Sequence, residues 1–155
     1  VTEFTYDPTN GNLLAIKDPL NHVTTITYND FGQPLSVQGP IATEPPTTFA
    51  YDVVSRLLSL TDPRGLVTQF RYDSLNRVTD IADARQGLTR FTYDPNGNLL
   101  SVTDAKHQTT TYTYDNMDRL KTCTDAPNRQ ESYQHNTAGR RTALTSLDGA
   151  GTCYA

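Results

Sequence analysis

Hydrophobic and polar residues alternate along this chain in short stretches that return at a nearly fixed period. Residues 91–104 are the clearest copy, with the pattern apolar-x-Tyr-Asp-x-x-Gly-polar-Leu-x-x-Val-x-Asp. The tyrosine of this pattern recurs every 21 to 23 residues, at Tyr6, Tyr28, Tyr51, Tyr72, Tyr93 and Tyr114, and one further step of 21 lands on His135. Self-similarity at such a period indicates a repeat architecture, here of about seven copies.

Each copy contains two turn sequences, which we call the first turn and the second turn. Asp94-Pro95-Asn96-Gly97 is a first turn, and its order of residues suits a type I turn followed by a left-handed residue. Asp62-Pro63-Arg64-Gly65 is a second turn with the same chemistry. The fourth place of the first turn holds Gly11, Gly32, Ser55, Asn76, Gly97, Asp118 and Gly139. All of these except Ser55 are residue types that tolerate a positive φ.

Two tight turns per period predict two antiparallel strands per copy, and therefore an all-β meander of about fourteen strands. At roughly 4.8 Å per strand, the sheet would extend about 65 Å, so we expect it to curl. Phe91 and Tyr93 alternate with Thr92 and should share one face. Leu99 and Val102 are three residues apart, which requires a bulge or a change of face that the sequence does not locate.

The equivalent tyrosines should form a row of rings on the apolar face, about 9 to 10 Å apart, and we expect this row to be the core. Composition agrees with strands, because the chain has twenty-five Thr and nine Tyr against one Met and no Trp, although only 35% of it is hydrophobic. Its net charge is −4 and it has no basic cluster, which argues against nucleic-acid binding. No apolar run approaches the roughly 20 residues of a membrane span.

Aspartates supply fourteen of the seventeen acidic residues, and ten of them occupy two fixed places of the repeat. Those after the tyrosine are Asp7, Asp52, Asp73, Asp94 and Asp115, and those that open the second turn are Asp18, Asp62, Asp83, Asp104 and Asp125. A ladder of carboxylates is one way to bind calcium. We favour turn capping, because each Asp opens a Pro/Gly-type turn where its side chain accepts backbone N–H groups. Paired-carboxylate glycoside hydrolysis is disfavoured, since two of these residues would have to differ from identical neighbours.

The histidines and cysteines form no motif with metal-ligand spacing. His107 occupies the fourth place of a second turn, His22 lies beside that place, and His135 replaces a tyrosine. Without a His-x-x-x-His or Cys-x-x-Cys pattern, we expect no metal site and no cofactor. Cys123 occupies an apolar position of the repeat, so we interpret it as a small core residue. Whether it pairs with Cys153 is left open by the sequence.

The Tyr-Asp pairs, with their Gly-Arg-Leu-like and Asp-Pro-x-Gly-like companions, resemble the YD repeats of the Rhs family. These repeats also occur in the C component of insecticidal toxin complexes, in wall-associated bacterial proteins and in teneurins. The resemblance covers residues 4–152, so we treat 1–155 as a single array cut from a larger protein. The repeat positions that we expect to maintain the structure are Tyr6, Asp7, Gly11, Tyr28, Gly32, Tyr51, Asp52, Tyr72, Asp73, Tyr93, Asp94, Gly97, Tyr114, Asp115 and Gly139. Ser55, the weakened copy at 133–140 and the Pro-rich excursion at 39–46 depart from the pattern.

In that family the repeats form a long sheet that spirals into a hollow β-shell around a C-terminal toxin domain. The resemblance therefore implies a non-enzymatic shell segment of a secreted or cell-surface protein, whose partners are the rest of the shell and the enclosed toxin. The alternative is an adhesion module that binds cell-surface carbohydrate. Residues 62–66 are similar to the self-cleavage motif of Rhs cores, but they lie in phase with the repeat, so we interpret them as a turn. The uncapped sheet edges predict a longer parent protein or edge-to-edge self-association.

Overall fold

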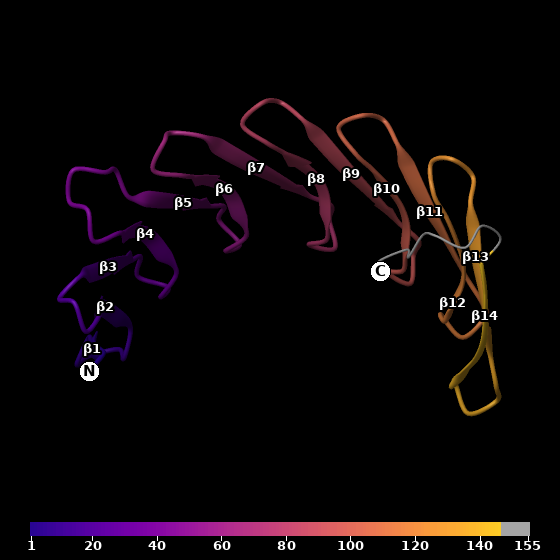
Figure 1. The fold of residues 1–155 in the computed structure, drawn as a ribbon, viewed down its shortest axis with the longest axis horizontal. Helices are drawn as coiled ribbons and strands as arrows, with labels where there is room; N and C mark the ends of the chain where they lie inside the picture. The colour runs from indigo at the N-terminus through magenta and orange to yellow at the C-terminus, as the bar shows by residue number, and fades with distance from the viewer. Residues whose placement is uncertain (147–155) are drawn as a thin grey trace. The chain divides into compact units, whose positions relative to one another are not determined.

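The computed structural model describes residues 1–146 as β-strands joined by short connections (Figure 1). The strands are β1 (Glu3–Tyr6), β2 (Leu13–Lys17), β3 (Val23–Tyr28), β4 (Pro34–Gln38), β5 (Thr47–Tyr51), β6 (Leu57–Thr61), β7 (Val67–Tyr72), β8 (Val78–Ala82), β9 (Leu88–Tyr93), β10 (Leu99–Thr103), β11 (Thr109–Tyr114), β12 (Leu120–Thr124), β13 (Gln130–His135) and β14 (Arg141–Ser146). They form one antiparallel sheet in chain order. The predicted all-β meander of fourteen strands is confirmed, whereas its curl into a spiral stays a prediction.

The sheet divides into two compact units, Val1–Arg71 and Tyr72–Ala155. In the first unit, each strand from β1 to β7 pairs with the next one along the chain. In the second unit the same holds from β8 to β14. Consecutive pairing follows from the tight turns, because a connection of a few residues allows only a neighbouring antiparallel partner. Residues 1–146 contain no helix that could cross a membrane.

A β-bulge recurs beside the first turn and explains the three-residue spacing that the sequence left unresolved. In the β9–β10 hairpin, Tyr93 lies opposite Leu99, but its neighbour Thr92 lies opposite Ser101, so Leu100 is an extra residue. Val102 then lies opposite Phe91 and returns to the face of Leu99. The same register shift occurs in the other described hairpins that contain a first turn. The bulge therefore places both apolar residues of the second strand on the tyrosine face.

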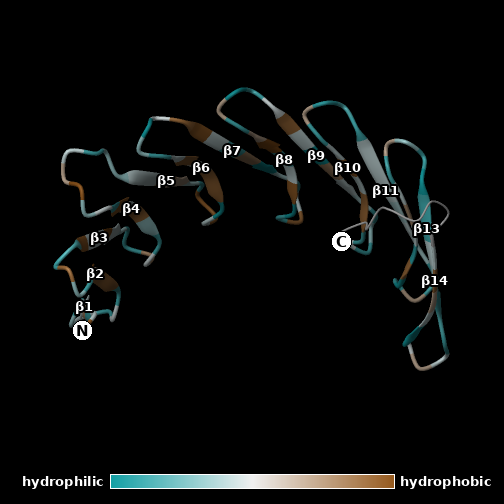
Figure 2. Ribbon diagram, viewed as in Figure 1, coloured by the Kyte–Doolittle hydropathy of each residue, from teal (hydrophilic) through white to brown (hydrophobic). Residues whose placement is uncertain are grey.

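The two faces of the sheet differ in chemistry. Along β3, exposure alternates residue by residue, with Ile26 and Tyr28 partly covered and Thr25 and Thr27 exposed. On the more exposed face, hydroxyl groups pair across neighbouring strands, as between Thr92 and Ser101 at 2.6 Å and between Thr113 and Thr122 at 2.6 Å. Figure 2 shows hydrophobic residues mainly on the strands and hydrophilic residues mainly at the turns. The alternation therefore produces an apolar face and a hydroxyl-rich face.

The tyrosine row, which we expected to be the core, is only half-buried. Tyr28, Tyr51, Tyr93 and Tyr114 all fall in the intermediate range of exposure. A single sheet layer covers its apolar face only with neighbouring side chains, which leaves each ring partly open. Among the described residues, the most buried are Tyr112, Cys123 and Glu131, which lie in one cross-strand row of β11, β12 and β13.

The Pro-rich excursion at 39–46 leaves the strand register intact. It replaces the second turn between β4 and β5, where Ser36 still lies opposite Thr48 and Val37 opposite Thr47. Gln38 closes the excursion, because its side-chain amide donates hydrogen bonds to the carbonyl oxygens of Gly39, Ile41 and Glu44 at 3.2, 3.2 and 3.0 Å. The insertion is thus accommodated as a loop outside the sheet.

Candidate functional site

In a repeat protein, we take as the candidate site the set of contacts that recurs from copy to copy. The first of these contacts are made by the aspartate that follows the tyrosine. Asp73 accepts hydrogen bonds at one carboxylate oxygen from the backbone N–H groups of Leu75 and Arg77, at 2.9 and 3.0 Å. The N–H of Asn76 donates to the Asp73 carbonyl at 3.2 Å, and Asn76 has a φ of 64°. These contacts build a type I turn that ends in a left-handed residue, as the sequence predicts.

The second turn uses the same chemistry. Asp104 accepts the N–H groups of Lys106 and Gln108 at 2.8 Å each, and His107, in the fourth place, has a φ of 62°. The interpretation of these aspartates as turn caps is therefore confirmed. Residues 1–146 contain no group of three or more His, Cys, Asp or Glu side chains arranged to hold a metal ion.

Every first turn has a positive φ two residues before its second strand, including Ser55, where φ is 71°; in the first copy, whose turn is one residue longer, this residue is Gly11. The predicted glycines have the same conformation, with φ values of 77° at Gly11, 75° at Gly32, 96° at Gly97 and 78° at Gly139. Serine does not favour a positive φ. Ser55 nevertheless adopts one, because the capping contacts of Asp52 and the pairing of the flanking strands determine the conformation of the turn.

Hydrogen bonds lower the pKa of the capping carboxylates in both turns. The pKa of Asp73 is lowered by the backbone hydrogen bond from Arg77, and that of Asp125 by the side-chain hydrogen bond from Arg129. At Asp115, the hydrogen bond from the Arg119 side chain, with Nε 2.7 Å from the carboxylate oxygen, lowers the pKa from 3.8 to about 2. A hydrogen-bond donor stabilises the ionised carboxylate, and it therefore lowers the pKa of the carboxyl group.

The tyrosine hydroxyl connects each copy to the one before it. Tyr28 donates to the carbonyl of Leu13 at 2.9 Å, and Tyr51 donates to that of Pro34 at 2.9 Å. In the second unit, Tyr93 donates to Val78 at 2.8 Å and Tyr114 donates to Leu99 at 3.0 Å. Each acceptor is the first residue of the second strand of the preceding copy. Sequence analysis placed the tyrosines correctly but missed this role.

A long polar side chain at the end of the first turn connects each copy to the one after it; we call it the bridging residue. Arg77 donates from Nε to its own turn cap Asp73 at 2.7 Å and from Nη1 to the carbonyl of Asp94 in the next turn at 2.9 Å. Its guanidinium carbon also lies 4.7 Å from the centre of the Tyr93 ring. Arg119 makes the equivalent bond to the carbonyl of Asn136 at 3.0 Å.

Shorter amides serve as bridging residues in other copies. The Gln33 amide donates to the carbonyl of Ser55 at 2.9 Å. The Asn98 amide donates to its own cap Asp94 at 2.9 Å and to Asp118 of the next turn at 2.7 Å. The available signal for these residues was the Gly-Arg-Leu-like pattern, in which a polar residue always precedes the second strand.

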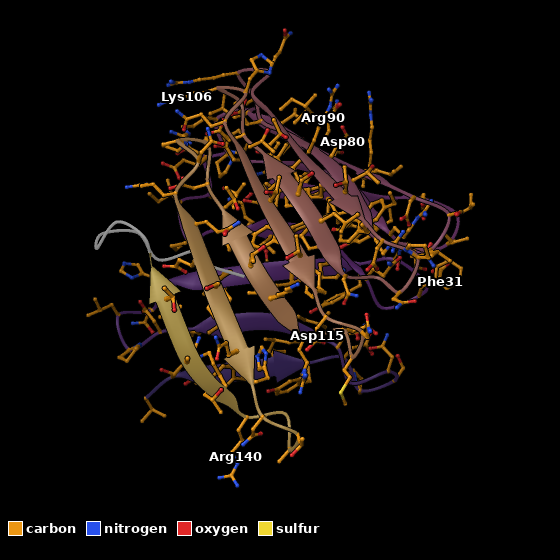
Figure 3. The ribbon with its side chains drawn as sticks, turned by 90° about the vertical axis from the view of Figure 1, so that its right-hand side faces the viewer. Phe31, Asp80, Arg90, Lys106, Asp115 and Arg140 are labelled. Carbon is orange, nitrogen blue, oxygen red and sulfur yellow. The ribbon has the colours of Figure 1, made fainter. Side chains whose placement is uncertain are left out.

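Figure 3 shows how the second unit places the two kinds of turn at opposite ends of its strands. Lys106, in a second turn, lies at one end, whereas Asp115 and Arg140, from first turns, lie at the other. Asp80 and Arg90, an ion pair at 3.4 Å, lie on neighbouring strands between them. The bridging residues are therefore confined to one end of the strands.

The remaining candidate residues lie apart from one another. His22 contacts its own turn cap Asp18 at 2.8 Å, and His135 ends β13 where other copies have tyrosine. Cys123 is 0% exposed, which confirms its position in the core, and it is disulfide-bonded. Cys153 lies outside the described residues. Tyr6, which has no preceding copy in the chain, is 57% exposed.

Glu131 was missed by sequence analysis. It is 7% exposed and accepts a hydrogen bond of 2.6 Å from the hydroxyl of Tyr133. Burial, together with this contact, raises the pKa of Tyr133 to about 12. The copy that contains Glu131 has lost the Tyr-Asp pair, so the repeat pattern gave no signal for this position.

Fold and contacts together define an all-β protein of side-by-side two-stranded repeats. The RHS Repeat family model matches residues 51–89 and 93–129. The chain therefore belongs to the RHS-repeat family, as its YD pattern indicated. No curated protein sequence matches the chain.

Solved structures of toxin complexes have the same fold. The crystal structure of TcdB2-TccC3 superposes with a TM-score of 0.80 at 18% identity, covering 96% of this chain and 9% of that one. The Photorhabdus luminescens Tc holotoxin pore with the mutation TccC3-D651A gives 0.77 at 19% identity, with coverages of 94% and 9%. The TcdB2-TccC3-Cdc42 crystal structure gives 0.77 at 18% identity, also with coverages of 94% and 9%. The chain thus spans about a tenth of the length of these proteins.

Proposed function

We propose that this chain is a non-catalytic wall segment of an Rhs-type β-shell that encloses a toxin polypeptide, within a secreted or cell-surface protein. The observation that carries the proposal is the recurrence of one set of contacts between copies, the tyrosine hydroxyl directed backwards and the bridging residue directed forwards. These contacts allow a sheet to be extended by any number of copies, which is what a wall requires. The likeness in fold to structures of TcdB2-TccC3 supports the same role.

On this proposal, the partners of the chain are further copies at its two sheet edges and the enclosed polypeptide. β1 and β14 end the described sheet, and each presents backbone N–H and C=O groups on one side. Pairing of these edges with more repeats would satisfy those groups. Edge-to-edge self-association of separate chains uses the same chemistry and stays a prediction.

The test is limited proteolysis of the full-length polypeptide that contains this array. We expect the segment that follows the repeats to resist a protease under native conditions, and to be cut once mild denaturant opens the sheet. A matched protein in which Tyr93 and Tyr114 are both replaced by alanine should release the segment at a lower denaturant concentration. Cleavage of that segment at the same rate with and without a folded array would contradict enclosure.

Carbohydrate binding, the alternative function, stays an untested prediction. Four of the tyrosine hydroxyls that could contact a sugar already donate to backbone carbonyls. Glycan-array binding by this chain, lost in a folded Tyr93→Ala variant, would favour the adhesion role over the shell role.

A further inference from the structure

Within residues 1–146, the junction of the first and second copies lacks the bridge that Gln33, Arg77, Asn98 and Arg119 make in other copies. Asn12 occupies the bridging position there, because it precedes β2 as Arg77 precedes β8. Within the described residues its side chain makes no hydrogen bond to the next turn. The Asn12 amide lies next to Gly32 of the next turn. Its side-chain oxygen is 3.7 Å from the position that a Cβ atom would occupy if Gly32 were replaced by another residue. Asn98 bridges because the next turn offers it the carboxylate of Asp118, whereas the corresponding residue for Asn12 is Gly32, which has no side-chain acceptor.

A cleft of about 780 Å³ opens at this junction. Its lining includes Asp7, Asn12, Tyr28, Asn29 and Asp30. Two carboxylates, those of Asp7 and Asp30, line the cleft, and no lysine or arginine does. Among the described residues, Asp30 has no hydrogen-bond or ion-pair partner. Phe31, on the turn that follows Tyr28, is 83% exposed and also lines the cleft.

The second unit shows what this arrangement of groups binds. There the Arg77 guanidinium contacts three groups, namely the carboxylate of Asp73, the carbonyl of Asp94 and the face of the Tyr93 ring. The repeat places Asp7, Asn29 and Tyr28 at the corresponding positions around the cleft. Oδ1 of Asp7 accepts hydrogen bonds from the backbone N–H and the hydroxyl of Thr9 at 2.8 and 2.6 Å, and no lysine or arginine lines the cleft to pair with this carboxylate.

We propose that this cleft binds an arginine side chain of a polypeptide partner, which takes the place that the bridging arginine occupies in other copies. A guanidinium fits because its planar fork can donate to a carboxylate and a carbonyl at once while its face stacks on the tyrosine ring. The second carboxylate, Asp30, favours a cation over a neutral amide. Lysine would supply the charge without the fork or the stacking plane. This proposal does not rest on the shell function.

Titration of the full chain with the capped peptides acetyl-Gly-Arg-Gly-amide and acetyl-Gly-Lys-Gly-amide tests the proposal, followed by amide NMR shifts. We expect the arginine peptide to shift the signals of Tyr28 and Phe31, and to bind roughly tenfold more tightly than the lysine peptide. Equal affinity for both peptides, or shifts that avoid residues 7–32, would overturn the proposal.

Two variants and a matched control make the test independent of folding failures. Asn12→Arg supplies the guanidinium from the chain itself, so it should abolish peptide binding and raise the unfolding midpoint. Asp30→Asn removes an exposed charge that makes no described contact, so it should weaken binding while leaving the strand spectrum unchanged. Asn98→Arg, at a bridging position that is already satisfied, should leave peptide binding unaltered. Wild-type affinity in folded Asn12→Arg would overturn the proposal.

Discussion

The Tyr93 hydroxyl donates a hydrogen bond of 2.8 Å to the backbone carbonyl of Val78, fifteen residues earlier in the chain. Tyr93 ends β9 and Val78 begins β8, so the bond joins one copy to the copy before it. Phenylalanine would satisfy hydrophobicity alone but has no hydroxyl to make this bond, which accounts for tyrosine at this position of the repeat.

Removing this hydroxyl should therefore destabilise the second unit without disturbing its packing. We expect Tyr93→Phe to lower the free energy of unfolding by about 1 kcal/mol, the usual net value of one such hydrogen bond. Urea unfolding followed by circular dichroism measures the change. Tyr6→Phe is the matched control, because Tyr6 is 57% exposed and its hydroxyl makes no hydrogen bond among the described residues. Equal effects of the two substitutions would contradict a connecting role for the hydroxyl.

The bridging arginine should not tolerate lysine. Arg77 uses two nitrogens on two different acceptors and stacks on Tyr93, and lysine cannot reproduce this geometry. We expect Arg77→Lys to cost about 1 kcal/mol of unfolding free energy. Arg64→Lys is a suitable control, since the Arg64 side chain is 79% exposed and, within residues 1–146, bonds only to its own turn cap Asp62. A loss at Arg64 as large as that at Arg77 would contradict a specific role for the contacts of Arg77 with Asp94 and Tyr93.

Acid should weaken the fold over a defined range of pH. Asp115 has a pKa of about 2 in the folded protein against an ordinary 3.8, so its contacts contribute fully above pH 3.8 and are lost as the pH falls through 2. The lowered pKa values of Asp52, Asp73 and Asp94 act in the same direction. We expect the urea midpoint to be constant near neutrality and to fall below pH 4. Asp115→Asn should lower the midpoint at pH 7 and make the acid-induced fall shallower; an unchanged slope would contradict the assignment.

Ser55 offers a stabilising substitution. Its φ of 71° is costly for a residue with a Cβ, and glycine occupies the same place in four other copies. We expect Ser55→Gly to raise the unfolding free energy by about 1 kcal/mol. Ser59→Gly, in the middle of β6, should have the opposite effect because glycine weakens a strand interior. Destabilisation by both substitutions would mean that the turn does not hold Ser55 in the left-handed region.

The features that could be predicted from the sequence are those that depend on residues close together in the chain. The capping by Asp73 and the left-handed φ at Gly97 follow from turn chemistry within five residues, so they could be read directly. The bulge at Leu100 and the contact between Tyr93 and Val78 depend on which residues of neighbouring strands lie opposite each other. Periodicity does not contain that register, and both features required the structure.

How deeply the tyrosine row is buried could not be predicted from the sequence, for a related reason. Periodicity shows that Tyr28 and Tyr93 share a face, but it does not show whether a second layer covers that face. In the described residues, neighbouring side chains cover the rings only in part. The bridging residues were missed because Gln33, Asn98 and Arg119 differ in charge and length, although all three reach the next turn.

Excision of one complete period tests most directly the claim that each 21-residue unit is an interchangeable pair of strands. Deleting residues 94–114 joins Tyr93 to Asp115, which restores a Tyr-Asp pair and preserves the contact of Tyr93 with Val78. We expect this protein to retain a strand spectrum and a cooperative urea transition. Deleting only 94–103, about half a period, should abolish both, because it removes one strand and reverses the direction of every later one. Unfolding by the full-period deletion, or equal tolerance of the two deletions, would contradict the account.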